Sequence, residues 1–287
     1  MDQRHYTTGI SACARSKDWQ QACGLLTAMP KAAVLPDVFH FSAAISSCEK
    51  AFRWQEAVKL FETMPQESIQ PNIVSFNATI SAFAKCGQWQ HALSLFKRIS
   101  ERNCQPDVIS VNTTIGSFKQ DGKWEQALSL LEGMPRLAIQ PDIVTFNSSI
   151  SACEKQGQWH HALGLLHAML TLRVQPDAFG FNTVIKSLRH PAAAADFSGD
   201  AALRSWQVAF ALLETMPNLH ATPDARSIDM SCASCRLKLP FGRWWQELVM
   251  SRTECYSKLT DSVLYIHFLK SCLLHKYGSH IFLKQIS

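Results

Sequence analysis

The sequence has little of what marks a membrane protein, a fibrous protein or a disulfide-stabilised miniprotein. No stretch of its 287 residues approaches the ~18–20 uninterrupted apolar residues that a membrane-spanning helix requires, and the best candidate, residues 263–274, is broken by His267 and Lys270. With 12 Gly, 12 Pro and 10 Cys, the chain is too poor in these residues to be collagen-like or disulfide-dense. Only 18% of residues are charged and 10% are aromatic, which excludes global disorder.

The motifs of the common enzyme classes are also missing. The sequence shows no Ser/His/Asp arrangement, no phosphate-binding Gly-rich loop and no paired-carboxylate motif, so we expect a protein that is not an enzyme and needs no cofactor. Cys232 and Cys235 form a CxxC pair, with Cys272 and His275 further along the chain. One such pair with a distant mate is a weak signal for a Cys₃His zinc site, and we predict no metal.

What the sequence does contain is a repeat with a period of 35 residues. Trp and Pro each recur at this spacing, as Trp19, Trp54, Trp89, Trp124 and Trp159 and as Pro36, Pro71, Pro106, Pro141 and Pro176. A fixed period of this size is typical of a solenoid. The period defines the units 3–37, 38–72, 73–107, 108–142 and 143–177, followed by 178–224, which carries 12 extra residues around 191–202. Residues 225–287 carry no repeat and form a second region.

Each unit has helical apolar spacing twice. In the first half an Ile recurs in all six units, as Ile10, Ile45, Ile80, Ile115, Ile150 and Ile185. In the second half a Trp and a Met lie on one helical stripe with an Ala that would let two helices approach closely: Ala22, Ala57, Ala92, Ala127, Ala162 and Ala209. We predict that the Trp and Met stripes are core and that Met-Pro pairs such as Met64-Pro65 end the second helix. The sequence therefore predicts an all-α fold, an α-solenoid of stacked helical hairpins.

The cysteines inside the repeats follow the same pattern. Cys13, Cys48 and Cys153 occupy a position that carries Phe83 or Phe118 in other units, so we predict buried small apolar side chains there. Their irregular pairing options indicate a reducing compartment.

The repeats resemble those of the pentatricopeptide repeat (PPR) family, of the P type. The resemblance rests on VSFNATI at 74–80, IVTFNSSI at 143–150, QALSLL at 126–131, IQPD at 139–142 and the closing Pro-Asp or Pro-Asn of each unit. It covers residues 3–224 and implies a right-handed superhelix that binds single-stranded RNA, one base per repeat. It also implies a role in RNA processing, stability, editing or translation in a mitochondrion or plastid, with other RNA-processing proteins as further partners.

By this resemblance the fifth and last residues of each unit read the base. The pairs are Thr7 with Asp37, Ser42 with Asn72, Asn77 with Asp107, Asn112 with Asp142, Asn147 with Asp177, and Asn182 with Asp224. The family's preferences then predict the target 5′-GAUUUU-3′, with cytosine tolerated at the last four bases. The chemistry is suitable, because Asn offers both a donor and an acceptor and a hydroxyl can do either.

Two further sets of residues complete the expected interface. Apolar second residues would hold the base faces from either side: Phe39, Val74, Ile109, Val144 and Phe179. Basic thirteenth residues would form a column along the phosphate backbone: Arg15, Lys50, Lys85 and Lys155. The first unit has Arg4 in place of the apolar second residue, so Thr7 is the least typical reader.

Other interpretations of these positions stay open. The last residue of each unit precedes a helix, where Asp or Asn is a preferred N-cap. The basic column is equally compatible with a solvated face. A helical scaffold that binds protein would use the polar residues as caps alone, and a truncated gene product would have no role of its own.

The two ends of the sequence and its net charge add little support for RNA binding. The usual N-terminal cap and an organelle presequence are not visible, and residues 225–287 have no recognised fold, although their start is a candidate partial cap. Residues 1–224 carry 19 basic and 19 acidic residues, whereas residues 225–287 carry 9 and 4, so the net charge of +5 belongs to the tail. We therefore expect modest, moderately salt-sensitive affinity and no membrane or small-molecule partner.

Overall fold

The computed structural model describes residues 2–102 and 104–189, together with 208–209, 211–213, 215–219, 221–222 and 227. Every regular element among them is a helix. The predicted insertion at 191–202, the reader Asp224 and the CxxC pair of the tail lie outside the described residues. The chain divides into two compact units, residues 1–155 and residues 156–287.

The first unit is a series of helical hairpins. Each repeat supplies a first helix and a second helix, some followed by a short 3₁₀ turn. The elements are α1 (Gln3–Ser16), α2 (Trp19–Ala28), η1 (Pro30–Ala32), α3 (Val38–Lys50), α4 (Trp54–Gln66), α5 (Ile73–Lys85), α6 (Trp89–Glu101), α7 (Val108–Asp121), α8 (Trp124–Gly133), η2 (Met134–Leu137) and α9 (Ile143–Lys155). These bounds confirm the predicted helix-turn-helix unit and its register.

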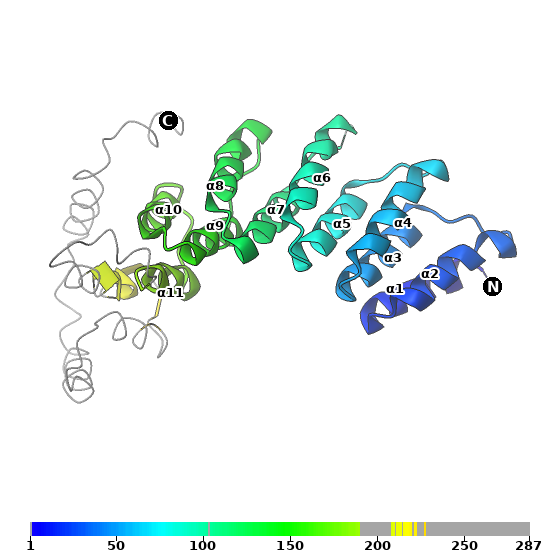
Figure 1. The fold of residues 1–287 in the computed structure, drawn as a ribbon, viewed down its shortest axis with the longest axis horizontal. Coiled ribbons are helices and arrows are strands. Elements are labelled where there is room, and N and C mark those ends of the chain that lie inside the picture. The colour runs from blue at the N-terminus through cyan, green and yellow to red at the C-terminus, as the bar shows by residue number, and fades with distance from the viewer. Residues whose placement is uncertain are drawn as a thin grey trace. The chain divides into compact units, whose positions relative to one another are not determined.

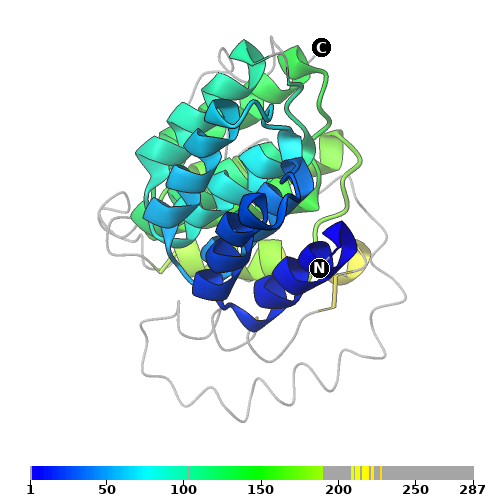
Figure 2. The ribbon, with the colours of Figure 1, turned by 90° about the vertical axis from the view of Figure 1, so that its right-hand side faces the viewer.

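The first helices form a continuous layer in this unit. Neighbouring first helices α1, α3, α5, α7 and α9 pack along one another, and each second helix packs between its own first helix and the next one. Figure 1 shows this row in chain order, and Figure 2 shows it from the α1 end. A hairpin alone would leave an apolar face in water, so each unit depends on its neighbours. The α-solenoid is confirmed.

The repeated apolar positions make the core. The recurring Ile and the recurring Ala of all six units have no exposed surface, and neither do the Met side chains Met29, Met64, Met134, Met169 and Met216. Cys48 and Cys153 are likewise inaccessible and Cys13 is buried, as predicted. A larger side chain at any of these inaccessible Ala positions would have to displace its neighbours.

The Trp stripe is less buried than predicted. Trp19, Trp54, Trp89 and Trp124 are half-buried, and only Trp159 is buried. Each of these Trp residues begins a second helix, at the edge of the layer, so one side of the ring meets water. Trp54 packs against Phe83 with ring centroids 5.7 Å apart, and the Arg53 guanidinium lies 4.8 Å from the Trp19 ring. The prediction that the Trp residues are core is therefore wrong for four of them.

Both turns of the repeat use a residue in the left-handed region. After the first helix it is the fifteenth residue of the unit: Lys17, Phe52, Gly87, Gly122 and Gly157, with φ between 58° and 69°. After the second helix it is the thirty-first residue: Ala33, Ser68, Ala138 and Arg173, with φ between 56° and 58°. At turns of both kinds an amide further on donates to a carbonyl near the helix end, as when Ile69 donates to Met64 at 2.8 Å. This is the C-terminal capping geometry that a helix end needs to satisfy its carbonyls.

Proline does not set the end of the second helix. Pro65 lies inside the last turn of α4, which runs on to Gln66, so the predicted stop at Met64-Pro65 is wrong. α6 has no proline and ends at the corresponding residue, Glu101. Both helices are followed by the same capping hydrogen bond, in which Ile69 donates to Met64 at 2.8 Å and Cys104 donates to Ile99 at 3.2 Å. After α4 the left-handed residue Ser68 precedes this bond. α2 and α8 do end before their Met-Pro pair, and each continues as a 3₁₀ turn.

The second unit contains α10 (Trp159–Thr171), α11 (Ala178–Ser187) and η3 (Pro217–Leu219). α10, a second helix, packs against α11, the first helix of the following repeat, and Leu166, Met169 and Ile185 of these helices are inaccessible. The repeat pattern therefore continues into this unit.

Candidate nucleic-acid interface

The last residue of each repeat caps the first helix of the next. Its side chain accepts a backbone amide of the first turn in the bonds Asp37–His40, Asn72–Ser75, Asp107–Ser110, Asp142–Thr145 and Asp177–Gly180, with donor–acceptor distances of 2.8 to 3.1 Å. The predicted capping role is therefore real. Caps of this kind contribute about 1 kcal/mol each.

Two of these caps also hold the predicted base reader of the preceding repeat. Asn77 Nδ2 donates to both carboxylate oxygens of Asp107, at 3.1 and 3.3 Å. Asn112 Nδ2 donates to Asp142 in the same way, at 3.0 and 3.2 Å. The fifth and last residues of a unit thus meet although they are 30 residues apart. Capping and contact with the reader are compatible because one carboxylate does both.

The Asp142 carboxylate decides which way the Asn112 amide points. Burial alone would raise the pKa of Asp142, but hydrogen bonds from the Thr145 amide and from Asn112 lower it below its usual range. A carboxylate accepts only, so the Asn112 NH₂ group, and not its oxygen, must face Asp142. The amide is thereby oriented before any ligand arrives.

The first repeat departs from this arrangement. His40, the third residue of the next unit, lies between the reader and the cap: its Nε2 is 3.0 Å from Thr7 Oγ1 and its Nδ1 is 2.6 Å from Asp37 Oδ1. His40 is 1% exposed. Burial opposes ionisation of Asp37, but the hydrogen bonds and charge of His40 and the amide of Phe39 leave its pKa lowered. Thr7 and Asp37 are therefore linked through a histidine.

The other predicted readers have different surroundings. Ser42 is 7% exposed and donates to the Val38 carbonyl at 2.7 Å, so its hydroxyl faces its own helix. Asn147 and Asn182 are half-buried on α9 and α11. Asp177 caps α11, and the partner expected for Asn182, Asp224, is outside the described residues.

The predicted base-sandwiching residues are exposed apolar side chains. Phe39, Val74, Ile109, Val144 and Phe179 are each about half exposed, between 49% and 58%. They share one repeat position, next to the readers on the first turn of the first helix. Scattered apolar side chains on a surface are normal, but here five of them recur at one repeat position.

The predicted phosphate column lies at the far end of the first helices. Arg15, Lys85 and Lys155 are exposed and Lys50 is half-buried. Lys85 already has an ionic partner, because its Nζ lies 2.8 Å from Glu49 Oε1, which also accepts from the Ser81 hydroxyl at 2.7 Å. The cationic column is thus weakened at one member.

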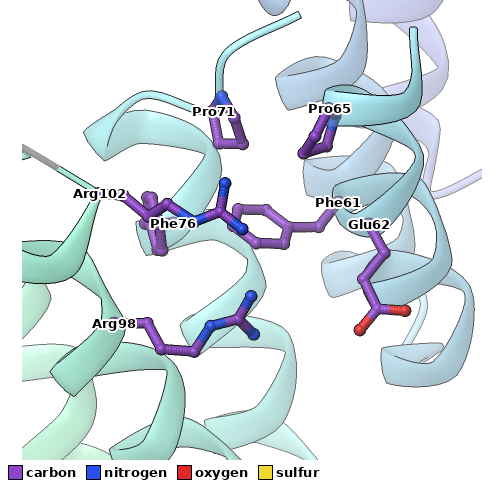
Figure 3. Close-up of a pocket in the computed structure, with 7 residues that line it drawn as sticks. All are labelled: Phe61, Glu62, Pro65, Pro71, Phe76, Arg98 and Arg102. Atoms are coloured by element: carbon purple, nitrogen blue, oxygen red, sulfur yellow. The ribbon is translucent and has the colours of Figure 1, made fainter. Parts of the chain in front are cut away.

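A cavity of about 180 Å³ lies elsewhere in the first unit. Phe61 and Phe76 form its floor, with ring centroids 4.9 Å apart. Figure 3 shows Arg98 of α6 and Arg102, just after the end of α6, on one side of these rings, opposite Glu62 of α4. None of its lining residues is a predicted reader.

Among the residues that the structure describes, no helix has the length and apolar character needed to cross a bilayer, and no three His, Cys, Asp or Glu side chains gather as metal ligands do.

Comparison with solved structures supports the fold. A crystal structure of the maize pentatricopeptide repeat protein PPR10 is 24% identical, with a TM-score of 0.62 over 87% of this chain. PPR10 in complex with an 18-nt psaJ RNA element is 18% identical, with a TM-score of 0.54 over 88% of this chain. The PPR domain of Arabidopsis thaliana protein-only RNase P 1, in complex with tRNA, is 14% identical, with a TM-score of 0.52 over 67% of this chain and 95% of that domain. The chain spans 34% and 44% of the two PPR10 chains. At these identities the likeness concerns the fold alone, and no curated protein matches the sequence.

The sequence itself matches a family model four times in tandem. The PPR repeat family matches residues 36–85, 71–120, 106–155 and 141–190. Successive matches begin 35 residues apart, which is the period of the Trp and Pro residues. Together they span residues 36–190, more than half of the 287 residues. The chain is a member of the PPR repeat family.

Proposed function

We propose that this chain binds single-stranded RNA sequence-specifically, one base per repeat, with 5′-GAUUUU-3′ as its preferred target. The observation that carries the proposal is the repeated pairing of a reader with a cap beside an exposed apolar side chain. Asn77 with Asp107 and Asn112 with Asp142 each lie next to such a residue, Val74 and Ile109. An oriented amide recognises a base edge, and aliphatic side chains contact the base faces.

The exposed apolar series is the part that a purely structural role does not explain. Helix capping accounts for the last residue of each unit, but it requires nothing of the second residue. Val74, Ile109 and Val144 are more than half exposed although each could have been polar without cost to the core. Unstacked bases have apolar faces at a regular spacing, and they are the ligand that this periodic surface fits.

The proposed biological role is RNA processing, stabilisation, editing or translation in a mitochondrion or plastid. It rests on membership of the family, and the PPR10 structure solved with an 18-nt RNA element shows the kind of ligand that a related fold accommodates.

The proposal is tested by selecting RNAs from a random pool, and then by changing the readers. We expect enrichment of 5′-GAUUUU-3′ over scrambled hexamers and poly-A. Changing Asn77, Asn112 and Asn147 to Ser, and Asp107, Asp142 and Asp177 to Asn, is expected to move preference from uracil toward adenine. Each Asn introduced in place of Asp107, Asp142 or Asp177 can still cap its helix, as Asn72 does, so the variant keeps its fold. Equal affinity of the parent protein for 5′-GAUUUU-3′ and for scrambled hexamers would refute the proposal, and so would an unchanged base preference in the variant. Either result would favour a protein-binding scaffold.

A further inference from the structure

The third residue of each repeat is a position that the sequence interpretation passed over. It lies in the first turn of the first helix, between the cap at its own helix and the reader of the preceding repeat. In the described repeats that follow another, it is His40, Ser75, Ser110, Thr145 and Gly180, all buried.

The polar members of this set take two orientations. Ser75 and Ser110 donate to the backbone carbonyl of the cap residue, at 2.8 and 2.7 Å, and so turn away from the reader. Thr145 Oγ1 instead donates toward Asn112 Oδ1 at 2.5 Å and lies 2.8 Å from Asp142 Oδ1. His40 bridges Thr7 and Asp37 in a corresponding way. We call His40 and Thr145 the bridging residues.

The difference is sharpest between two sites that carry the same reader and cap. At the third site the Asn77 NH₂ is held by Asp107, but Asn77 Oδ1 is buried with no hydrogen-bond partner. At the fourth site Asn112 is held at both ends, by Asp142 through its NH₂ and by Thr145 through its oxygen. Rotating the Asn112 amide breaks hydrogen bonds at both ends, whereas rotating Asn77 breaks them at one end only.

From this geometry we infer that the third residue of a repeat is a positioning residue for base recognition by the repeat before it. The inference rests on the proposed function. A reader that keeps one orientation offers the base one pattern of donors, whereas a reader that rotates offers either a donor or an acceptor. The bridged site of Asn112 therefore discriminates uracil from cytosine more strongly than the unbridged site of Asn77. At the first site, His40 holds Thr7 and strengthens the preference for guanine over adenine.

The chain offers a reciprocal exchange as the test. Ser110→Thr introduces the bridging side chain at the third site, and Thr145→Ser removes it from the fourth. Both variants keep a hydroxyl that accepts the cap amide, as Ser110 and Thr145 already do at 2.9 and 3.2 Å. Binding is measured against hexamers with uracil or cytosine at the third or the fourth base, and thermal unfolding checks the fold.

We expect Thr145→Ser to lower the uracil-to-cytosine affinity ratio at the fourth base by about fivefold, the value of one neutral hydrogen bond. Ser110→Thr is expected to raise the ratio at the third base by a similar factor. Ratios at the first and second bases serve as internal controls and stay unchanged. His40→Ser is expected to lower the guanine-to-adenine ratio at the first base alone.

The outcomes separate this inference from the proposed function. If the unmodified protein prefers its hexamer but neither exchange alters the ratio at its own base, the positioning role is refuted and the proposed function stands. If both exchanges change affinity equally at every base, the residues act on stability alone and the inference fails. If the protein has no base preference, the proposed function fails first. A measurement without RNA adds a separate check: the side-chain amide hydrogens of Asn112 should exchange with solvent more slowly than those of Asn77, and equal rates would contradict the bridge.

Discussion

Asp107 combines two roles that a pair of substitutions can separate. Its carboxylate accepts the Ser110 amide at 2.8 Å as the N-cap of α7, and it accepts both hydrogen bonds from Asn77. Asp107→Ala removes both roles. Loss of the cap costs about 1 kcal/mol, and loss of the reader contact costs about 1 kcal/mol more, so we expect a decrease of about 2 kcal/mol in the free energy of unfolding.

Asp107→Asn removes only the contact with the reader. Asn72 shows that an Asn oxygen can cap this type of helix, because it accepts the Ser75 amide at 3.0 Å. With its oxygen used for the cap, the new amide turns its NH₂ toward Asn77, whose own amide must then rotate to present its oxygen, so the orientation set by the carboxylate is lost. We expect a decrease of at most about 1 kcal/mol, no more than half that of the alanine variant.

The assay is urea unfolding followed by circular dichroism, together with RNA binding at the third base. Both variants are expected to lose uracil selectivity there, since Asn77 loses its orienting partner in each. Asp121→Ala, at the exposed end of the same helix, is the matched charge control, with an expected change within about 0.5 kcal/mol. Equal destabilisation by Asn and Ala would show that the cap is not what matters in Asp107. Unchanged third-base selectivity in both would show that Asp107 does not orient the reader.

Three other changes test the remaining structure. Phe52→Gly should raise the free energy of unfolding by about 1 kcal/mol, because Phe52 is exposed and held at φ 58°, a conformation that glycine adopts without strain; an unchanged urea midpoint would contradict this. Ala92→Leu should lower it by about 1–3 kcal/mol, because Ala92 has no exposed surface where two helices meet, and a variant as stable as the parent would show that the contact has free space. Glu49→Gln should strengthen RNA binding and steepen its salt dependence by freeing Lys85, an effect that should vanish in the Lys85→Gln background. Burial raises the pKa of the Cys153 thiol to about 12, so alkylation of Cys153 at pH 8 should require denaturant, and rapid alkylation of the folded protein would contradict its burial.

Much of the fold was predictable because repetition makes each position visible several times. One Ile or one Ala says little about burial, but six at a fixed spacing indicate a packed position, and all six of each are inaccessible. The same repetition gave a wrong prediction of full burial for Trp19 and its half-buried counterparts. A large aromatic residue at a helix start fits an apolar pattern whether it is buried fully or on one side only. The prediction that Pro65 ends α4 was wrong because the effect of a proline depends on how many residues of the helix remain after it.

The sequence predicted which residues belong to the candidate site, but it did not predict the hydrogen bonds between them. The resemblance identified the pair of Asn77 and Asp107, which the fold brings together across 30 residues. Nothing in the pattern distinguished that pair from Asn112 and Asp142. The third residue differs between them, Ser110 in one case and Thr145 in the other, yet both are small hydroxyl residues and both fit the same helix turn.

By itself, the sequence determined the period, the helix-turn-helix unit and the apolar face of each helix, because these follow from local spacing. The readers are predictions that rest on the resemblance to the PPR family. The tertiary structure alone decided which groups those readers meet. It placed His40 between Thr7 and Asp37 and turned the Ser42 hydroxyl toward its own helix. It also left Asn77 Oδ1 without a hydrogen-bond partner and paired Lys85 with Glu49. A hydrogen bond depends on distances of a few tenths of an ångström between side chains on neighbouring helices, and those distances exist only after the helices have packed.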